Sequence, residues 1–186
     1  MRIVAGQFKG RAIVAPKTDA TRPTSDRARE SLFNVLAHAG WAPALDGVRV
    51  MDLFAGSGAL GLEAISRGAG FCLFVEMAHA ARGAIRQNIE TLGLFGITRI
   101  HRRSATSLGE KPAGSGDVFD LAFMDPPYHK GLVEPCLQSL VEGQWLSENA
   151  LVVVETAVDE TPDFAGWEIV NEREIGAAKV WFLKCA

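Results

Sequence analysis

Short apolar runs alternate with helix-length amphipathic patterns through the middle of the chain, and this alternation restricts the possible folds more than any other feature. Strands separated by helical segments form βαβ units, which build a parallel sheet. The apolar runs are nearly continuous, as expected for strands covered on both faces. We therefore predict an α/β, doubly wound fold. The strand patterns are 48–54, 71–76, 98–103, 118–125 and 150–155, and the helical patterns are 59–68, 78–93 and 131–142.

Two more strand patterns, at 166–174 and 177–184, follow near the C-terminus with only a short turn between them. Parallel strands need a long crossover connection, whereas antiparallel strands need only a turn. We therefore predict that the mostly parallel sheet ends in an antiparallel pair.

The first forty residues have a different pattern from the rest of the chain. Two short alternating strands in residues 1–15 are joined through Gly-Gln-Phe-Lys-Gly, and a helical pattern runs from the capping residues 24–26 to Gly40. We predict that residues 1–40 form a β-hairpin and helix extension and that residues 41–186 form the main domain.

Positive charge is concentrated at the N-terminus of an acidic protein. The whole chain has a formal net charge of −3, but residues 1–30 contain seven Lys or Arg and three acids, a net charge of +4, which leaves −7 on the remainder. A basic segment on an acidic body indicates a polyanionic partner. The alternative is a charged surface that only faces water.

The ends and the cysteines of the chain bear on location and metal chemistry. Residues 1–11 are charged and lack the apolar core of a signal peptide, and no apolar run reaches membrane-spanning length. Cys72, Cys136 and Cys185 are too widely spaced for a disulfide framework or a zinc site. We expect a cytoplasmic protein with no membrane partner and no metal.

A glycine loop follows the first strand of the main domain. Gly56, Ser57 and Gly58 stand between a strand pattern and a helical one. Glycine lets the backbone turn tightly and approach a ligand there, and the helix N-terminus supplies free N–H groups. Glu76 ends the second strand, where an acid accepts hydrogen bonds from ribose hydroxyls in doubly wound folds. Together these residues predict half of a pocket for an adenosine-containing cofactor.

The same loop also matches the dinucleotide fingerprint Gly56-x-Gly58-x-x-Gly61, so an NAD-dependent oxidoreductase is an alternative. Two features favour another cofactor. Asp52 stands at the strand end, where a carboxylate suits a cationic ligand better than a pyrophosphate. The expected antiparallel pair also differs from the all-parallel dinucleotide arrangement.

A second motif, Asp125-Pro126-Pro127-Tyr128, follows the fourth strand. Taken alone it is a rigid turn, because two prolines cannot both continue a helix or a central strand. Together with the glycine loop it indicates chemistry on a nucleobase. The Asp125 carboxylate and the Pro126 carbonyl can accept hydrogen bonds from an exocyclic amine and draw its nitrogen toward a more nucleophilic, tetrahedral geometry. Tyr128 can stack on the unpaired or flipped base.

Both motifs should face one crevice, because ligands of open α/β sheets bind outside the carboxyl ends of the strands. A cationic methyl donor held over Gly56–Gly58 would then lie beside the amine, and proximity and alignment would supply much of the rate. The residues therefore predict a methyltransferase that modifies an exocyclic amine.

Four stretches of the sequence carry a family resemblance: DLFAGSGALGLEAISRGA, FVE, FDLAFMDPPY and TRPTSDRARESLFN. They resemble the bacterial 16S rRNA guanine-N2 methyltransferases of the RsmD family over nearly the whole chain. The resemblance implies a Rossmann-like fold with a seven-stranded sheet, S-adenosylmethionine as methyl donor, and a guanine of small-subunit rRNA as substrate, in an assembled or assembling particle. Methylation of adenine N6 in RNA or DNA and a non-catalytic RNA-binding assembly factor are the alternatives.

The resemblance also implies roles for individual residues. Asp125, Pro126, Pro127 and Tyr128 would form the catalytic motif. The third strand is followed by Ser104 and Ala105 where many relatives have an acid that meets adenine, and Ile175-Gly176 replaces a Tyr-Gly pair, so we assign that turn no function. The expected cofactor residues are Asp52, Phe54, Ala55, Gly56, Ser57, Gly58, Glu76, Ser104 and Ala105. The expected RNA contacts are Arg2, Lys9, Arg11, Arg22, Arg27 and Arg29.

Overall fold

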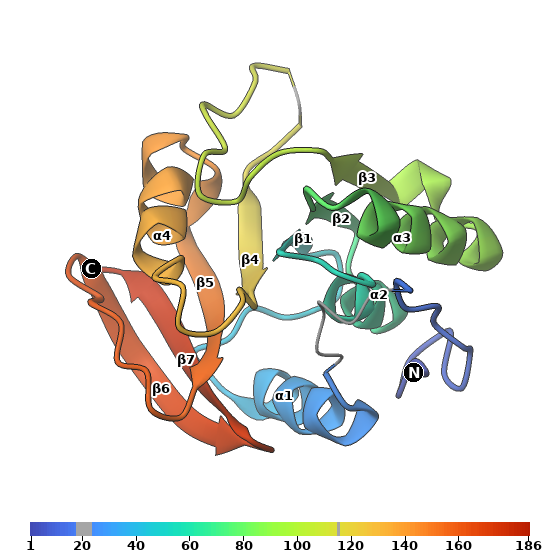
Figure 1. Cartoon of the computed structure of the whole chain (residues 1–186), viewed down its shortest axis with the longest axis horizontal. Helices are drawn as coiled ribbons and strands as arrows, with labels where there is room; N and C mark the ends of the chain where they lie inside the picture. The colour runs from blue at the N-terminus through green and yellow to red at the C-terminus, as the bar shows by residue number, and fades with distance from the viewer. Residues whose placement is uncertain (18–23, 115) are drawn as a thin grey trace.

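Within residues 1–17, 24–114 and 116–186, which the computed structural model describes, seven strands form a sheet in the order β3-β2-β1-β4-β5-β7-β6 (Figure 1). Strands β1 to β5 run parallel to one another, and β7 runs antiparallel to β5 and β6. The predicted α/β class, mostly parallel sheet and antiparallel last strand are confirmed. The strands are β1 (Arg49–Leu53), β2 (Phe71–Val75), β3 (Thr98–His101), β4 (Phe119–Met124), β5 (Leu146–Ala157), β6 (Trp167–Ile175) and β7 (Ala178–Cys185).

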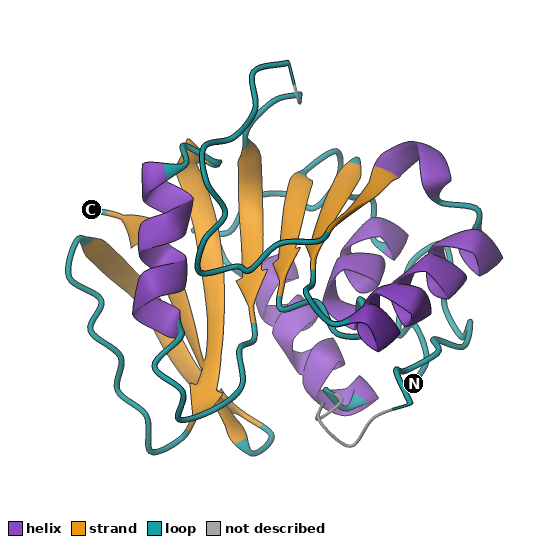
Figure 2. Cartoon of the chain, turned by 45° about the horizontal axis from the view of Figure 1, so that its top comes forward, coloured by secondary structure: helices purple, strands orange, loops and turns teal. Residues whose placement is uncertain are grey.

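Apolar side chains pack on both faces of this sheet, which explains the continuous apolar runs in the sequence. Along β1, Val50 packs in the cluster that contains α1, α2 and α3, whereas Met51 and Leu53 pack in the cluster that α4 covers. Figure 2 shows α4 apart from the other three helices. The helices are α1 (Asp26–His38), α2 (Ala59–Ser66), α3 (His79–Leu92) and α4 (Val133–Glu142), with a short 3-10 helix η1 (Phe95–Ile97) before β3.

The N-terminal segment differs from the predicted pair of strands. It closes into a narrow loop through a single antiparallel bridge between Arg2 and Ala12. Side chains of α2 occupy the backbone groups that a longer ladder would need. Glu63 accepts from the N–H groups of Val4 and Ala5 at 2.9 and 3.1 Å. The N-terminal loop is therefore bound to the helix that follows the glycine loop. The prediction of two strands is wrong in their length, because only one bridged pair of residues forms.

Helix α1 begins at the predicted cap, because Ser25 Oγ accepts from the Ala28 N–H at 3.1 Å. Its Leu32 and Phe33 share a hydrophobic cluster with the sheet, and Phe33 contacts Phe123 of β4 with ring centroids 5.5 Å apart. The boundary at residue 40 stays a prediction. Figure 1 shows α1 beside the lower end of β4 and the turn between β6 and β7.

Two further features concern the described part of the chain as a whole. None of its helices has both the length and the apolar composition needed to cross a membrane. Its His, Cys, Asp and Glu side chains do not gather in threes in a way that could hold a metal ion.

Candidate active site

The carboxyl edge of the sheet brings the two sequence motifs together. Leu53 of β1 pairs with Val75 of β2 and with Met124 of β4, so these three strands end at one level. The glycine loop, Glu76 and the motif 125–128 directly follow these strands. The two motifs therefore lie at the same edge of the sheet, and the crevice that they would share stays a prediction.

The glycine loop contains several left-handed backbone conformations close together. The φ angles of Phe54, Gly56 and Gly58 are +57°, +59° and +80°. Phe54 is the strained member, because a bulky residue adopts this conformation only when its surroundings enforce it, most often at a functional site. Gly58 is the N-cap of α2 and makes no side-chain capping bond. A Cβ at Gly58 would lie 3.1 Å from the Phe74 ring, whereas a Cβ at Gly56 would meet open space.

Asp52 lies inside this turn and not on its surface. Its side chain is buried, and Oδ2 accepts from the Gly61 N–H at 2.9 Å. Burial raises the pKa of Asp52 to about 8, the Gly61 hydrogen bond opposes this rise, and the charge of Glu76 adds to it. Asp52 holds the first turn of α2 against the end of β1, and its place beside the cofactor stays a prediction.

Glu76 joins the end of β2 to the glycine loop. Its two carboxylate oxygens accept from the Gly56 N–H at 2.8 Å and from the Ala78 N–H at 3.0 Å, and the side chain stays partly exposed. A carboxylate has about four acceptor positions, so hydrogen bonds to a ligand's hydroxyls remain possible. Its placement fits the role expected for a ribose acceptor.

Ser104 and Ala105 follow β3 along the same edge. Ser104 Oγ lies 2.8 Å from Thr106 Oγ1, and it accepts from the Thr106 N–H at 3.3 Å. Ala105 is buried in the cluster on the α4 face, so its methyl group packs in the core. Their contact with a cofactor stays a prediction.

The second motif leaves β4 as a rigid turn with a defined tyrosine. Pro126 is buried, Asp125 and Tyr128 are partly exposed, and Pro127 is exposed. The Tyr128 hydroxyl donates to Glu155 Oε1 at 2.9 Å, which fixes the ring beside the carboxyl end of β5. Sequence reasoning missed Glu155. Its signal was an acid near the end of a buried apolar strand, the same pattern that drew attention to Asp125.

The turn after Tyr128 is held by two further acids. The backbone N–H of His129, which has a φ of +58°, donates to Glu160, and Glu160 also accepts from the Ala157 N–H at 2.9 Å. His129 Nε2 lies 2.8 Å from Asp159 Oδ1. The hydrogen bond to Asp159 raises the pKa of His129 and lowers that of Asp159. These contacts join the catalytic turn to the segment that follows β5.

Arg29 is a correction among the predicted RNA contacts. Its side chain is fully buried, with Nε 3.1 Å from Glu63 Oε1 and Nη2 2.9 Å from Asp26 Oδ1. The guanidinium therefore cannot present its charge to a polyanion. It instead stabilises the packing of α1 against α2, where the Glu63 carboxylate also pairs with Arg67 at 3.0 Å.

The other N-terminal cations have varied surroundings. Arg2, Lys9 and Arg27 line one hollow of about 510 Å³, together with acids of α1. Arg11 is exposed and donates to the Thr91 carbonyl at 3.2 Å. Arg22 lies outside the described residues. Contact of these five cations with RNA stays a prediction.

The chain is similar to known proteins over almost its full length. The model of the family described as "Conserved hypothetical protein 95" matches residues 1–184. "Ribosomal RNA small subunit methyltransferase D" of Escherichia coli K12 is 36% identical over 178 residues, which cover 95% of this chain and 85% of the relative. "Putative rRNA methyltransferase YlbH" of Bacillus subtilis is 35% identical over 175 residues, which cover 94% and 92%.

A solved structure, "Putative methyltransferase yhhF from Escherichia coli", has a TM-score of 0.80 and 34% sequence identity, with 100% of this chain and 97% of that chain covered. Sequence and structure comparisons therefore both lead to proteins whose names describe them as methyltransferases. The chain belongs to the family described as "Conserved hypothetical protein 95", which is the RsmD family that its motifs resemble.

Proposed function

We propose that this protein transfers a methyl group from S-adenosylmethionine to the exocyclic N2 amine of a guanine in 16S rRNA of the small ribosomal subunit, in the cytoplasm. The observation that carries the proposal is the pairing of β1 with β4, which sets the glycine loop beside Asp125 and Tyr128 at one edge of the sheet. The family and the printed names of its relatives support the substrate class.

The residues around the glycine loop fit S-adenosylmethionine. The open space beside Gly56 would admit a ligand close to the backbone, the N-terminus of α2 lies next to it without a side-chain cap, and Glu76 offers acceptor positions to ribose hydroxyls. Ser104 would accept from the adenine amine. When bound, S-adenosylmethionine supplies an electrophilic methyl group.

The catalytic motif would prepare the guanine amine for this transfer. The Asp125 carboxylate and the Pro126 carbonyl would accept hydrogen bonds from the two N–H groups of the amine. These hydrogen bonds would direct the nitrogen lone pair toward the methyl group of the cofactor. Asp125 would also take the proton that the nitrogen loses. Tyr128, fixed by its 2.9 Å hydrogen bond to Glu155, would stack on the flipped base. Most of the rate would come from alignment of the two reactants.

Labelled S-adenosylmethionine tests the reaction, the base and the substrate in one assay. The protein is incubated with unmodified small subunits, naked 16S rRNA or duplex DNA, and the products are digested to nucleosides and identified by mass. We expect label in N2-methylguanosine from the ribosomal substrates. Label in N6-methyladenine would support methyl transfer to an exocyclic amine but would contradict guanine as the target base. Cofactor binding without any transfer would favour the assembly-factor alternative.

The Asp125→Ala variant tests the catalytic motif in the same assay. We expect transfer to fall at least 100-fold, because the amine loses both an acceptor and its orientation. Asp117→Ala is the matched control, since Asp117 is an exposed aspartate outside the motif. Full activity of the Asp125 variant would contradict the role of this carboxylate.

A further inference from the structure

A row of cross-strand neighbours connects the catalytic turn with the far edge of the sheet. Glu155 of β5, which binds the Tyr128 hydroxyl, pairs with Val180 of β7, and Val180 pairs with Arg173 of β6. Directly paired residues point to the same face, and adjacent strands are about 4.8 Å apart. Arg173 therefore lies about 10 Å from Glu155, at the same level of the sheet. Val180 packs in the cluster of α1, so this shared face is the α1 face.

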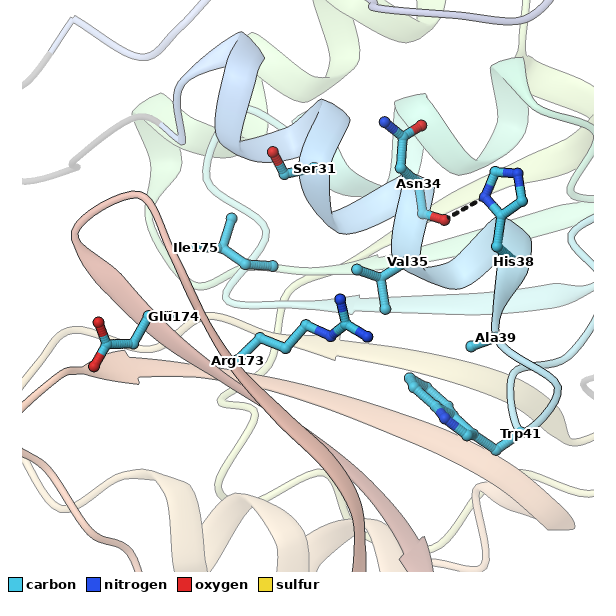
Figure 3. A pocket seen from close by; sticks show the side chains of 9 residues that line it. All are labelled: Ser31, Asn34, Val35, His38, Ala39, Trp41, Arg173, Glu174 and Ile175. Carbon is cyan, nitrogen blue, oxygen red and sulfur yellow. Dashed lines mark hydrogen bonds between the residues drawn. The ribbon is translucent and has the colours of Figure 1, made fainter.

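Arg173 lines a groove of about 560 Å³ between α1 and β6 (Figure 3). Its guanidinium extends toward Val35 of α1, whereas the Glu174 carboxylate points away from it. Trp41 lies on the same side, with its ring 4.8 Å from that of Phe182. The groove is lined by Ser31, Asn34, Val35, His38, Ala39, Trp41, Arg173, Glu174 and Ile175.

The chemistry of this groove matches an unpaired nucleotide. An arginine fork pairs with phosphate, an indole provides a stacking surface for a base, and the hydroxyl and amide groups of Ser31 and Asn34 can bond ribose or base edges. The position matches as well, because Arg173 lies on the same face and at the same level of the sheet as Glu155, which binds the Tyr128 hydroxyl. A second folded protein would not account for this continuity with the catalytic turn.

We propose that the groove between α1 and β6 binds a nucleotide next to the methylated guanine, with Arg173 on its phosphate and Trp41 beside its base. This inference rests on the proposed function and adds a subsite to it. It also gives a role to the region of the β6–β7 turn, for which the sequence motifs assigned none. The groove would help to select a substrate whose target lies in an unpaired strand.

Equilibrium binding of labelled protein to unmodified small subunits tests the subsite. We expect Arg173→Gln to weaken binding about tenfold, and to reduce the salt slope of log K by about 0.7, the value for one phosphate of a single strand. Arg99→Gln is the matched control, because Arg99 is an exposed arginine on β3 at the opposite edge of the sheet. It should change binding less than twofold.

Two further readouts separate binding from folding and from catalysis. Arg173→Lys keeps the positive charge but loses the planar fork of the guanidinium. Its loss in log K should therefore be about half of the loss in Arg173→Gln. S-adenosylmethionine affinity should be equal in all variants. If Arg173→Gln binds subunits as tightly as Arg99→Gln, the subsite is overturned even when wild-type protein methylates guanine. Wild-type protein that binds subunits and leaves guanine unmethylated would contradict the proposed function alone, because the binding comparison still decides the subsite.

Discussion

At the scale of single residues, two acids near the ends of neighbouring strands have opposite surroundings. Asp52 of β1 is 2% exposed and accepts one backbone hydrogen bond, whereas Glu76 after β2 is partly exposed and accepts two. The buried acid shapes the glycine loop, and the exposed acid keeps positions for a ligand. Sequence patterns placed both acids beside the cofactor, Asp52 near a cationic group and Glu76 at the ribose. They could not show which acid is buried, because burial depends on how α2 packs over β1.

The raised pKa of Asp52 predicts how stability depends on pH. Its folded-state pKa of about 8 lies above the ordinary aspartate pKa of 3.8, so between these values the folded protein binds more protons than the unfolded chain. Stability from this group is therefore fully present at low pH and falls as pH rises through that window. We expect the wild type to lose more than about 1.4 kcal/mol relative to Asp52→Asn between pH 5 and pH 8. Urea unfolding of both proteins measures this, and parallel pH profiles would contradict it.

At the scale of elements, the N-terminal loop, α1 and α2 are joined through buried charge. Glu63 of α2 accepts from the N–H groups of Val4 and Ala5 and pairs with Arg29 and Arg67. All its oxygens are thus used inside the protein. This network therefore joins the N-terminal loop and α1 to α2, the helix that follows the glycine loop.

Removing the charge of Glu63 should destabilise the fold strongly. Glu63→Gln leaves the buried guanidinium of Arg29 without its buried partner, and we expect a loss of about 3 kcal/mol in the free energy of unfolding. Glu90→Gln is the control, because Glu90 is an exposed glutamate on α3. Denaturant unfolding compares the two. A loss below about 1 kcal/mol in Glu63→Gln would mean that the network contributes little to stability.

The same elements show what sequence patterns can and cannot predict. Apolar periodicity was sufficient for β1, β2 and β4, and the cap at Ser25 was sufficient for the start of α1. Local pattern could not reveal that Glu63 would take the backbone donors of the N-terminal strands, because that contact joins residues far apart in the chain. For the same reason Arg29 looked like a surface cation. The burial of its guanidinium is set by tertiary packing, which a charge count does not contain.

At the scale of the whole molecule, sheet order bears on the choice between the two cofactors that fit the glycine loop. The dinucleotide fold has parallel strands in the order 3-2-1-4-5-6. Here β7 enters antiparallel between β5 and β6, and it carries the cross-strand row from Glu155 to Arg173. The sheet therefore keeps the β1–β4 switch point of a dinucleotide fold, but its second half ends in an antiparallel strand that a dinucleotide fold lacks.

This architecture predicts which small molecule stabilises the folded protein. A ligand that binds only the folded state at 100 times its dissociation constant adds about 2.7 kcal/mol, which raises the melting temperature of a chain of this size by roughly 5–10 °C. We expect this shift with S-adenosylmethionine and none with NAD at the same concentration. Asp125→Ala should keep the shift, because the proposed role of this carboxylate is to hold the substrate amine and not the cofactor. A rise in melting temperature with NAD and none with S-adenosylmethionine would favour the oxidoreductase alternative and contradict methyl transfer at this edge of the sheet.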